Sequence, residues 1–188
     1  MEVRALLDVL HIAERLKDEL RHCDTSKGRR ESVAEHSWRI ALMALFMQDE
    51  FPELDMDKVI RMCLIHDLGE CFTGDIPTFL KTKEDEEKED ETLAAWVASL
   101  PEPYGTELAD LYAEMNAQQT GEARLYKTLD KLEAVIQHNE ADIRTWEPHE
   151  YELNLTYAND IVAGTPYLEQ LREAIRDDTK QKIAEAQT

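Results

Sequence analysis

The sequence predicts an all-α protein, and three observations support this. Only 6 glycines and 6 prolines occur in 188 residues, and the long stretches between them are rich in Leu, Ala, Glu and Lys, which favour helices. Apolar residues recur at helical spacing along most of these stretches. No segment alternates apolar and polar residues convincingly enough to predict a strand. The length fits one domain spanning residues 1–188, a helical bundle around a single core.

The first helix is expected from about residue 2 to residue 22, where leucines recur at helical spacing. The next stretch, "CDTSKGRRES", is broken by Gly28 and is expected to be a loop. In "SVAE", Ser32 and Glu35 have the spacing of a capping box, which predicts the start of a second helix. That helix should end before Pro52.

The third predicted helix, "KVIRMCLIHDLGE", is apolar nearly all round and should therefore be central. Asp55 or Asp57 can cap its start, and Gly74 and Pro77 mark the turn after it. Further helices are expected in "DETLAAWVASL", "GTELADLYAEM", "EARLYKTLDKLEAVIQHNEADIRTW" and a last segment at about residues 165–187.

The chain is strongly acidic, with 41 acidic against 21 basic residues and a net charge of −20. A nucleic-acid binder normally presents a basic face, so long nucleic acid is not an expected partner, nor is an anionic membrane surface. Part of the excess lies in "KEDEEKEDE", which we interpret as the solvated start of a helix. No apolar run is long enough to span a bilayer, and the first residues contain no signal-peptide core.

The three cysteines point to a reducing compartment. Cys23, Cys63 and Cys71 are odd in number and form no C-x-x-C pair, which suits the cytoplasm. We interpret Cys63 and Cys71 as small core residues.

Four residues of metal-ligating type occupy comparable places on three predicted helices. His36 precedes an apolar stripe, His66 and Asp67 end the most apolar helix, and Asp130 borders the apolar face of a late helix. Burying two unpaired carboxylates would cost several kcal/mol. A divalent cation removes that cost, since imidazole and carboxylate are natural ligands for Mn, Co, Fe, Ni or Zn, with Mg also admissible.

Each of these residues has a simpler explanation when taken alone. A lone histidine such as His36 is more often a satisfied core residue, an adjacent His-Asp pair is common by chance, and Asp130 could lie on a charged surface. The conjunction of all four favours a metal site. No nucleophile elbow, phosphate-binding loop or dinucleotide fingerprint occurs, so hydrolysis by activated water is the economical chemistry.

Three extended motifs in order carry a family resemblance: "ESVAEHSWRIALMA", "IHDLGECFTGDIPT" and "TLDKLEA". Over roughly residues 15–140 the chain resembles HD-superfamily metal-dependent phosphohydrolases, and within them the 5′-deoxynucleotidase-like branch. The resemblance implies an HD-type all-helical bundle, usually homodimeric, that hydrolyses nucleoside monophosphates with one divalent metal ion.

Residue by residue, the resemblance implies that His36, His66, Asp67 and Asp130 are the metal ligands. It implies catalytic roles for Glu70 and Asp75, with Asp75 also contacting substrate, and a substrate-binding role for Arg21. One departure concerns His22, which stands where the compared branch has a tryptophan. That departure leaves fine substrate choice open.

The chemistry of the residues agrees with these roles. Glu70 lies three residues after Asp67, so it can reach a water on the metal or protonate a leaving oxygen. Asp75 is also a good turn or N-cap residue, and both roles can coexist. Phosphate needs fixed positive charge as well. The candidate cations, each of which could simply be a solvated surface residue, are Arg21, Lys27, Arg29, Arg30, Lys81 and Lys83. Trp38 and Trp96 are expected in the core.

These observations predict a metal-dependent phosphomonoesterase that converts (deoxy)nucleoside 5′-monophosphates to nucleoside and phosphate, with Glu70 and Asp75 in catalysis. Two alternatives remain at this stage. One is an HD phosphohydrolase acting on another phosphorylated small molecule. The other is a non-catalytic module that binds a metal or nucleotide.

Overall fold

The computed structural model describes residues 1–77 and 80–187. It is a helical bundle with one small antiparallel hairpin, so the predicted all-α class is confirmed. The longer helices are α1 (Val3–Ala13), α2 (Val33–Phe46), α3 (Met56–Ile65), α5 (Lys83–Ala98), α6 (Tyr104–Ala117), α7 (Gly121–Glu140) and α9 (Pro166–Glu185). The shorter elements are α4 (Glu70–Thr73), α8 (Glu150–Thr156), β1 (Leu20–Asp24), β2 (Arg30–Ser32) and the 3-10 turns η1 (Glu14–Lys17), η2 (Gln48–Glu50) and η3 (Ile143–Thr145).

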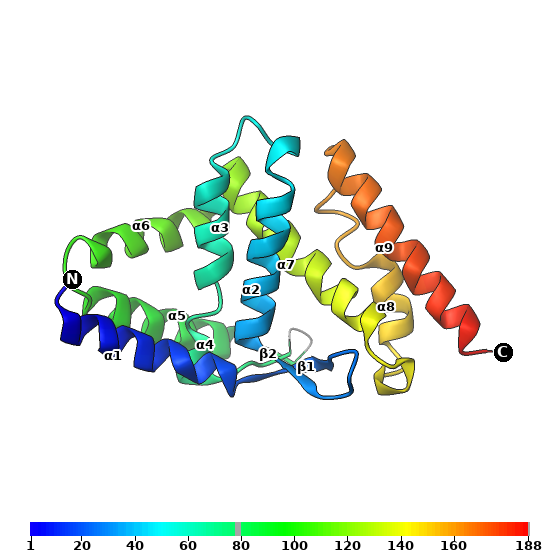
Figure 1. Cartoon of the computed structure of the whole chain (residues 1–188), viewed down its shortest axis with the longest axis horizontal. Helices are drawn as coiled ribbons and strands as arrows, with labels where there is room; N and C mark the ends of the chain where they lie inside the picture. Colours follow the sequence, from blue (N-terminus) through cyan, green and yellow to red (C-terminus); the bar gives the residue numbers. More distant parts are fainter. Residues whose placement is uncertain (78–79, 188) are drawn as a thin grey trace.

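Helices α2, α3 and α7 meet at the centre of the molecule, with α8 and α9 on one side and α1 and α4–α6 on the other (Figure 1). Their facing side chains form the main core, in which Ile40, Met62 and Leu129 have no exposed surface. As predicted, Cys63 is buried here, and Cys71 is buried in a smaller cluster. This packing brings the start of α2 and the end of α3 against the middle of α7.

The predicted helix starts are confirmed by their caps. Ser32 and Glu35 form a reciprocal capping box at α2, in which Ser32 Oγ accepts from the Glu35 backbone N–H. Asp55, one of the two candidate caps for α3, accepts from the Lys58 N–H. The acidic run after Lys83 is the solvated start of α5, as expected.

The predicted first helix is too long, and a hairpin was missed. The helix ends at Ala13, and the chain passes through η1 into strand β1, which pairs antiparallel with β2. Gly28, with φ +78°, makes the turn between the strands. The strands were invisible to pattern analysis because Cys23 is the only buried residue of β1. The leucines of α1 were misleading, since no residue of that fully described helix is buried.

Two other helices are shorter than expected. The third ends at Ile65, and the chain turns before α4 through i→i+3 bonds from Leu68 N–H to Ile65 O and from Glu70 N–H to Asp67 O. The late helix α7 ends at Glu140, and η3 and the unpredicted α8 follow it. The turn after Ile65 matters for the site, because it holds His66 and Asp67.

The expectation that Trp38 lies in the core is wrong. Its side chain is 59% exposed, because it lies on the outer face of α2, opposite His36. Trp96 is half-buried, with its ring centroid 6.0 Å from that of Phe72. Across the described residues, none of the helices has the length and apolar character needed to cross a membrane.

Candidate metal centre

The four residues proposed as ligands come together from α2, the end of α3 and α7. His36 lies in the first turn of α2 and is fully buried, and Asp130 lies midway along α7. His66 caps the end of α3, where its Nδ1 lies 2.9 Å from the Cys63 carbonyl oxygen. A carbonyl can only accept, so Nδ1 donates its proton to that oxygen, and Nε2 is the ring nitrogen that faces the cluster.

The ligating atoms converge on one point. His36 Nε2 lies 3.1 Å from Asp130 Oδ1, and His66 Nε2 lies 3.0 Å from Asp67 Oδ2. The cross distances are 3.8 Å from His66 Nε2 to Asp130 Oδ1 and 4.0 Å from His36 Nε2 to Asp67 Oδ2. The structure thus brings together the four residues that the sequence singled out.

These residues fit a divalent cation. His66 Nε2 is buried and has no hydrogen-bond partner of suitable geometry among the described residues, although Asp67 lies beside it. An unpartnered buried nitrogen is costly unless something else satisfies it. Two imidazoles and two carboxylates could hold such an ion, and this donor set suits the transition metals better than calcium.

The two carboxylates stay ionised. Burial alone would raise the pKa of Asp67, but the neighbouring His66 and His36 outweigh it and lower that pKa to about 2. Burial likewise opposes ionisation of Asp130, whose pKa is nevertheless held well below its ordinary value, chiefly by Lys127 and by the hydrogen bond from His36. Both side chains therefore present negative oxygens at neutral pH.

Glu70 behaves differently. Its side chain is 5% exposed, and burial, followed by the charges of Asp67 and Asp75, raises its pKa to about 10. Its Oε2 has no hydrogen-bond partner within the described part of the chain. Near neutral pH this carboxyl keeps its proton when no cation is bound, so it is set up as a proton donor.

Asp75 lies close enough to Arg21 and Asp67 for their charges to affect its pKa. Burial is the main reason that its pKa is raised. Thr82 caps α5, the next helix that the structure describes; the turn or capping role suggested for Asp75 falls on residues 78–79, which lie outside the described residues.

Arg21 reaches the site from β1. Its Nη1 lies 3.8 Å from Asp67 Oδ2, and its Nε lies 3.2 Å from Glu31 Oε2, with the side chain only 15% exposed. Next to it on the strand, His22 Nε2 lies 3.1 Å from Glu150 Oε1. The structure thus places the predicted substrate-binding arginine beside a proposed ligand.

Lys127 was missed by the sequence reasoning. Its Nζ lies 2.8 Å from Asp130 Oδ2, so one oxygen of Asp130 faces the histidines and the other faces a lysine. The i,i+3 spacing on a helix could have revealed this pair. Most of the other predicted phosphate-binding cations have different partners: Arg29 binds Glu35, Arg30 binds hairpin carbonyls, Lys81 binds Glu89 and Lys83 binds Glu87.

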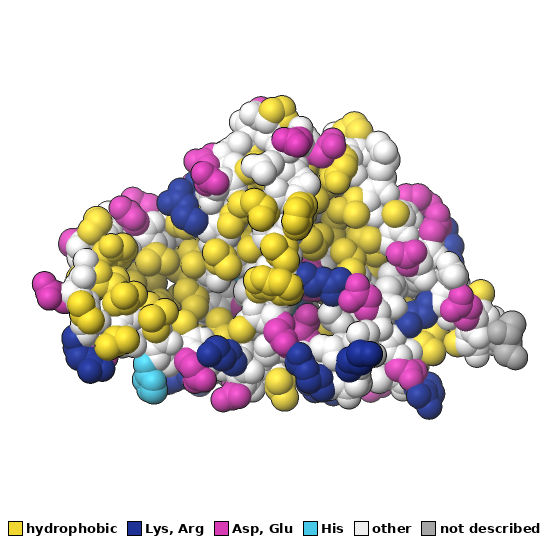
Figure 2. All heavy atoms as spheres, viewed as in Figure 1, with side chains coloured by type: hydrophobic (Ala, Val, Ile, Leu, Met, Phe, Trp, Pro, Cys, Tyr) yellow, Lys and Arg dark blue, Asp and Glu magenta, His cyan; other side chains and the backbone are white. Residues whose placement is uncertain are grey.

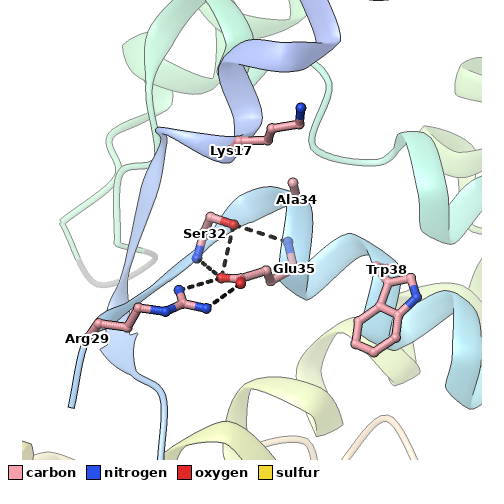
Figure 3. Close-up of a pocket in the computed structure, with 6 residues that line it drawn as sticks. All are labelled: Lys17, Arg29, Ser32, Ala34, Glu35 and Trp38. Atoms are coloured by element: carbon pink, nitrogen blue, oxygen red, sulfur yellow. Dashed lines mark hydrogen bonds and ion pairs between the residues drawn. The ribbon is translucent and has the colours of Figure 1, made fainter. Parts of the chain in front are cut away.

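A separate cavity of about 370 Å³ opens on the outer side of the start of α2 (Figure 3). Figure 3 shows Glu35 held by Ser32 and Arg29, with the exposed ring of Trp38 at the edge. Glu35 and Trp38 flank His36 in sequence but point away from it around the helix. This cavity therefore lies apart from the metal-ligand cluster.

Comparison with known proteins agrees with this geometry. An HD domain family model matches residues 13–172. The chain is 33% identical over 141 residues to human 5′-deoxynucleotidase HDDC2, an alignment covering 73% of this chain and 68% of that protein. It is 33% identical over 163 residues to the Xenopus laevis protein of the same name, covering 82% and 77%. The matched region spans only 54% of the bovine protein.

Solved structures show the same architecture. A predicted metal-dependent phosphohydrolase from Magnetospirillum magnetotacticum MS-1 superposes with a TM-score of 0.79 at 30% identity, covering 96% of this chain and 93% of that one. The cyanophage S-2L HD phosphohydrolase DatZ, solved with dA and one catalytic Zn²⁺, shares the fold at a TM-score of 0.61 and 23% identity, over 91% of this chain and 96% of its own. The chain therefore belongs to the HD domain family.

Proposed function

We propose that this chain is a metal-dependent phosphomonoesterase that hydrolyses (deoxy)nucleoside 5′-monophosphates to nucleoside and phosphate. The observation that carries the proposal is the convergence of two imidazole nitrogens and two ionised carboxylates beside the buried Glu70. The similarity to proteins named 5′-deoxynucleotidases supports the substrate class.

A bound divalent cation supplies Lewis acidity at a phosphoryl oxygen and lowers the pKa of a water molecule. The protein supplies the rest of the reaction. Asp67 and Asp130 provide negatively charged oxygens that can bind the cation, and the Cys63 carbonyl fixes the ring of His66. When water attacks phosphorus and the bond to the 5′-oxygen breaks, Glu70 gives its proton to that oxygen, and the nucleoside leaves as a neutral alcohol. One proton of the attacking water then restores Glu70, and the other stays on the released phosphate.

Substrate phosphate needs positive charge in a protein whose net charge is −20. Arg21 and Lys127 approach the ligand cluster from different elements, β1 and α7. Each can donate charge-assisted hydrogen bonds to phosphate oxygens. Asp75 completes the set as a substrate contact that can accept from a sugar hydroxyl.

The oligomeric state and compartment also belong to the proposal. One face of α1 is apolar, yet Val3, Leu6, Leu7 and Leu10 are between 47% and 74% exposed. Figure 2 shows hydrophobic side chains gathered over α1 and again over the α2–α3 face. Exposed apolar patches of this kind usually mark interfaces, and we assign the patch on α1 to the contact of a homodimer.

The three buried free cysteines suit a reducing cytoplasm, which we propose as the compartment.

The test of the reaction is phosphate release from a panel of ribo- and deoxyribonucleoside 5′-monophosphates. Chelator-treated protein is reloaded with Mn²⁺, Co²⁺ or Zn²⁺, and Asp67→Ala serves as the control. We expect metal-dependent release from deoxynucleotides by the parent protein and none by the variant, with helix content unchanged. Absence of release under every metal, or equal release by Asp67→Ala, would refute the proposal.

A further inference from the structure

Glu133 lies directly behind His36, on the side away from the other proposed ligands. Its Oε2 is 2.5 Å from His36 Nδ1, and the relative exposure of both side chains is 0%. The two residues are 97 positions apart and meet where α7 crosses the start of α2. Its Oε1 lies 3.6 Å from Arg39 Nε, so a positive charge compensates the buried carboxylate.

The contact is a hydrogen bond rather than part of a second metal site. Glu31, His36 and Glu133 do offer three ligand-type atoms within 4.8 Å of one another. However, atoms that share a zinc ion at about 2.0–2.1 Å stand ~3.3 Å apart in tetrahedral geometry. The 2.5 Å separation of Nδ1 and Oε2 is much shorter than that and matches a strong donor–acceptor pair.

The direction of this hydrogen bond decides what His36 can do. A carboxylate accepts, so the ring donates from Nδ1 and carries its proton there. Nε2 faces the cluster, 3.1 Å from Asp130 Oδ1, and is left as the ring nitrogen that a cation can bind in place of that contact. The opposite tautomer would put a proton between the ring and the space that the cation needs.

His66 provides an internal comparison. Its Nδ1 also donates to an oxygen on the side away from the cluster, the Cys63 carbonyl oxygen at 2.9 Å. Both histidines are therefore oriented from behind, one by a neutral backbone acceptor and one by a charged carboxylate. The charged acceptor gives the stronger hydrogen bond and makes the opposite ring nitrogen a better ligand.

We propose that Glu133 is a positioning residue for the metal centre, which orients His36, sets its Nε2-ligating tautomer and strengthens its metal binding. The inference rests on the proposed function in that it requires a cation at the His36 cluster. It does not depend on which substrate the enzyme takes.

The chain offers a matched control on the same helix. Glu140 also binds Arg39, with distances of 2.6 Å from Nη2 to Oε1 and 2.8 Å from Nη1 to Oε2. Its side chain is 47% exposed and lies about two turns beyond Glu133. Glu140→Gln and Glu133→Gln each remove one negative charge beside Arg39, but only the latter changes the partner of His36.

The test is the metal affinity of the purified protein, measured by competition with a chelating indicator for Co²⁺ and Zn²⁺. We expect Glu133→Gln to weaken binding by about 10- to 100-fold, as is typical when the outer partner of a ligating histidine is lost. Glu140→Gln should bind within about twofold of the parent protein. Unchanged affinity in Glu133→Gln, or an equal loss in both variants, would overturn the proposal.

A second measurement needs no variant. In ¹⁵N-labelled parent protein without metal, imidazole nitrogen shifts identify the protonated ring nitrogen of each histidine. We expect His36 to be protonated at Nδ1, with that proton shifted strongly downfield by Glu133. A proton on Nε2 alone would overturn the proposal even if Glu133→Gln failed to fold. If metal binds as expected but no nucleotide is hydrolysed, the proposed reaction fails while the role of Glu133 stands.

Discussion

The two carboxylate oxygens of Asp130 have different partners. Oδ1 faces the two histidines, at 3.1 and 3.8 Å, while Oδ2 accepts from Lys127 at 2.8 Å. The lysine holds the carboxylate ionised and leaves one oxygen directed at the cluster. His36 is divided in the same way, with one ring nitrogen toward Asp130 and the other toward Glu133. Each of these proposed ligands is thus held by a residue behind it, Asp130 by Lys127 and His36 by Glu133.

Lys127 should act on substrate as well as on Asp130, because its side chain is 41% exposed and can reach a bound phosphate. We expect Lys127→Met to lower kcat/KM for a nucleoside monophosphate by about 10- to 100-fold, the value of one charge-assisted hydrogen bond. Lys131→Met is the control, since Lys131 lies one turn further along the same face of α7 and its Nζ lies over the Tyr157 ring at 5.6 Å instead of beside Asp130. Similar losses in both variants would show that net charge, not contact, matters.

Glu70 should make the stability of the metal-free protein depend on pH. Its pKa is about 10 in the folded state against an ordinary value of 4.5, so the folded state binds the proton more tightly. This contribution to stability is complete below pH 4.5 and is lost as pH rises toward 10. Urea unfolding of metal-free protein should therefore show stability falling from pH 5 to pH 8, more steeply in the parent than in Glu70→Gln. Equal slopes would show that Glu70 is already ionised.

At the scale of elements, capping residues were the most reliable guide. Ser32, Glu35 and Asp55 fix the starts of α2 and α3 through local bonds that sequence spacing reveals. The order of the motifs along the chain likewise identified the four residues that converge. Local chemistry of this kind does not depend on the rest of the fold, which explains why it could be predicted.

Other elements depended on distant contacts and were missed. The hairpin is held by cross-strand bonds and by Arg30, which reaches the His22 carbonyl, and neither leaves a periodic pattern. Glu133 meets His36 only because α7 crosses α2. Trp38 was expected in the core, yet the face of α2 on which it lies is exposed to solvent. Pattern alone does not distinguish a face that packs inward from one left exposed.

Helix α5 offers a test of capping at this scale. Thr82 Oγ1 accepts from the Asp85 N–H at 3.3 Å, and the Asp85 carboxylate accepts in return from the Thr82 N–H at 3.0 Å. Thr82→Ala should cost about 1 kcal/mol and lower Tm by roughly 2–4 °C. Thr92→Ala, in the middle of the same helix, should change Tm little, because alanine is the better helix former there. Equal Tm values for Thr82→Ala and the parent protein would contradict the capping account.

At the scale of the whole molecule, a strongly acidic chain places two positive side chains, Arg21 and Lys127, beside the cluster of proposed ligands. The core formed by α2, α3 and α7 positions the proposed ligands, with Arg21 beside Asp67 and Lys127 beside Asp130. A net charge of −20 otherwise repels an anionic substrate. We expect a bound cation and these two residues together to offset this repulsion where the phosphate would bind.

The exposed face of α1 should carry the dimer contact. Leu6 is 47% exposed at the centre of that face, so Leu6→Glu should convert a dimer to a monomer in light scattering after size-exclusion chromatography. Leu153→Glu, at a leucine of α8 that is 37% exposed, should leave the dimer intact. A monomeric parent protein, or a dimeric Leu6→Glu variant, would rule out this interface.

The central claim is that His36, His66, Asp67 and Asp130 hold one catalytic metal ion. The most direct measurement is anomalous diffraction from crystals of the protein grown with Mn²⁺. The account predicts one strong peak bounded by these four side chains, and its loss in Asp67→Ala. A peak bound elsewhere, for example between Glu31 and Glu133, or no peak at saturating Mn²⁺, would contradict it.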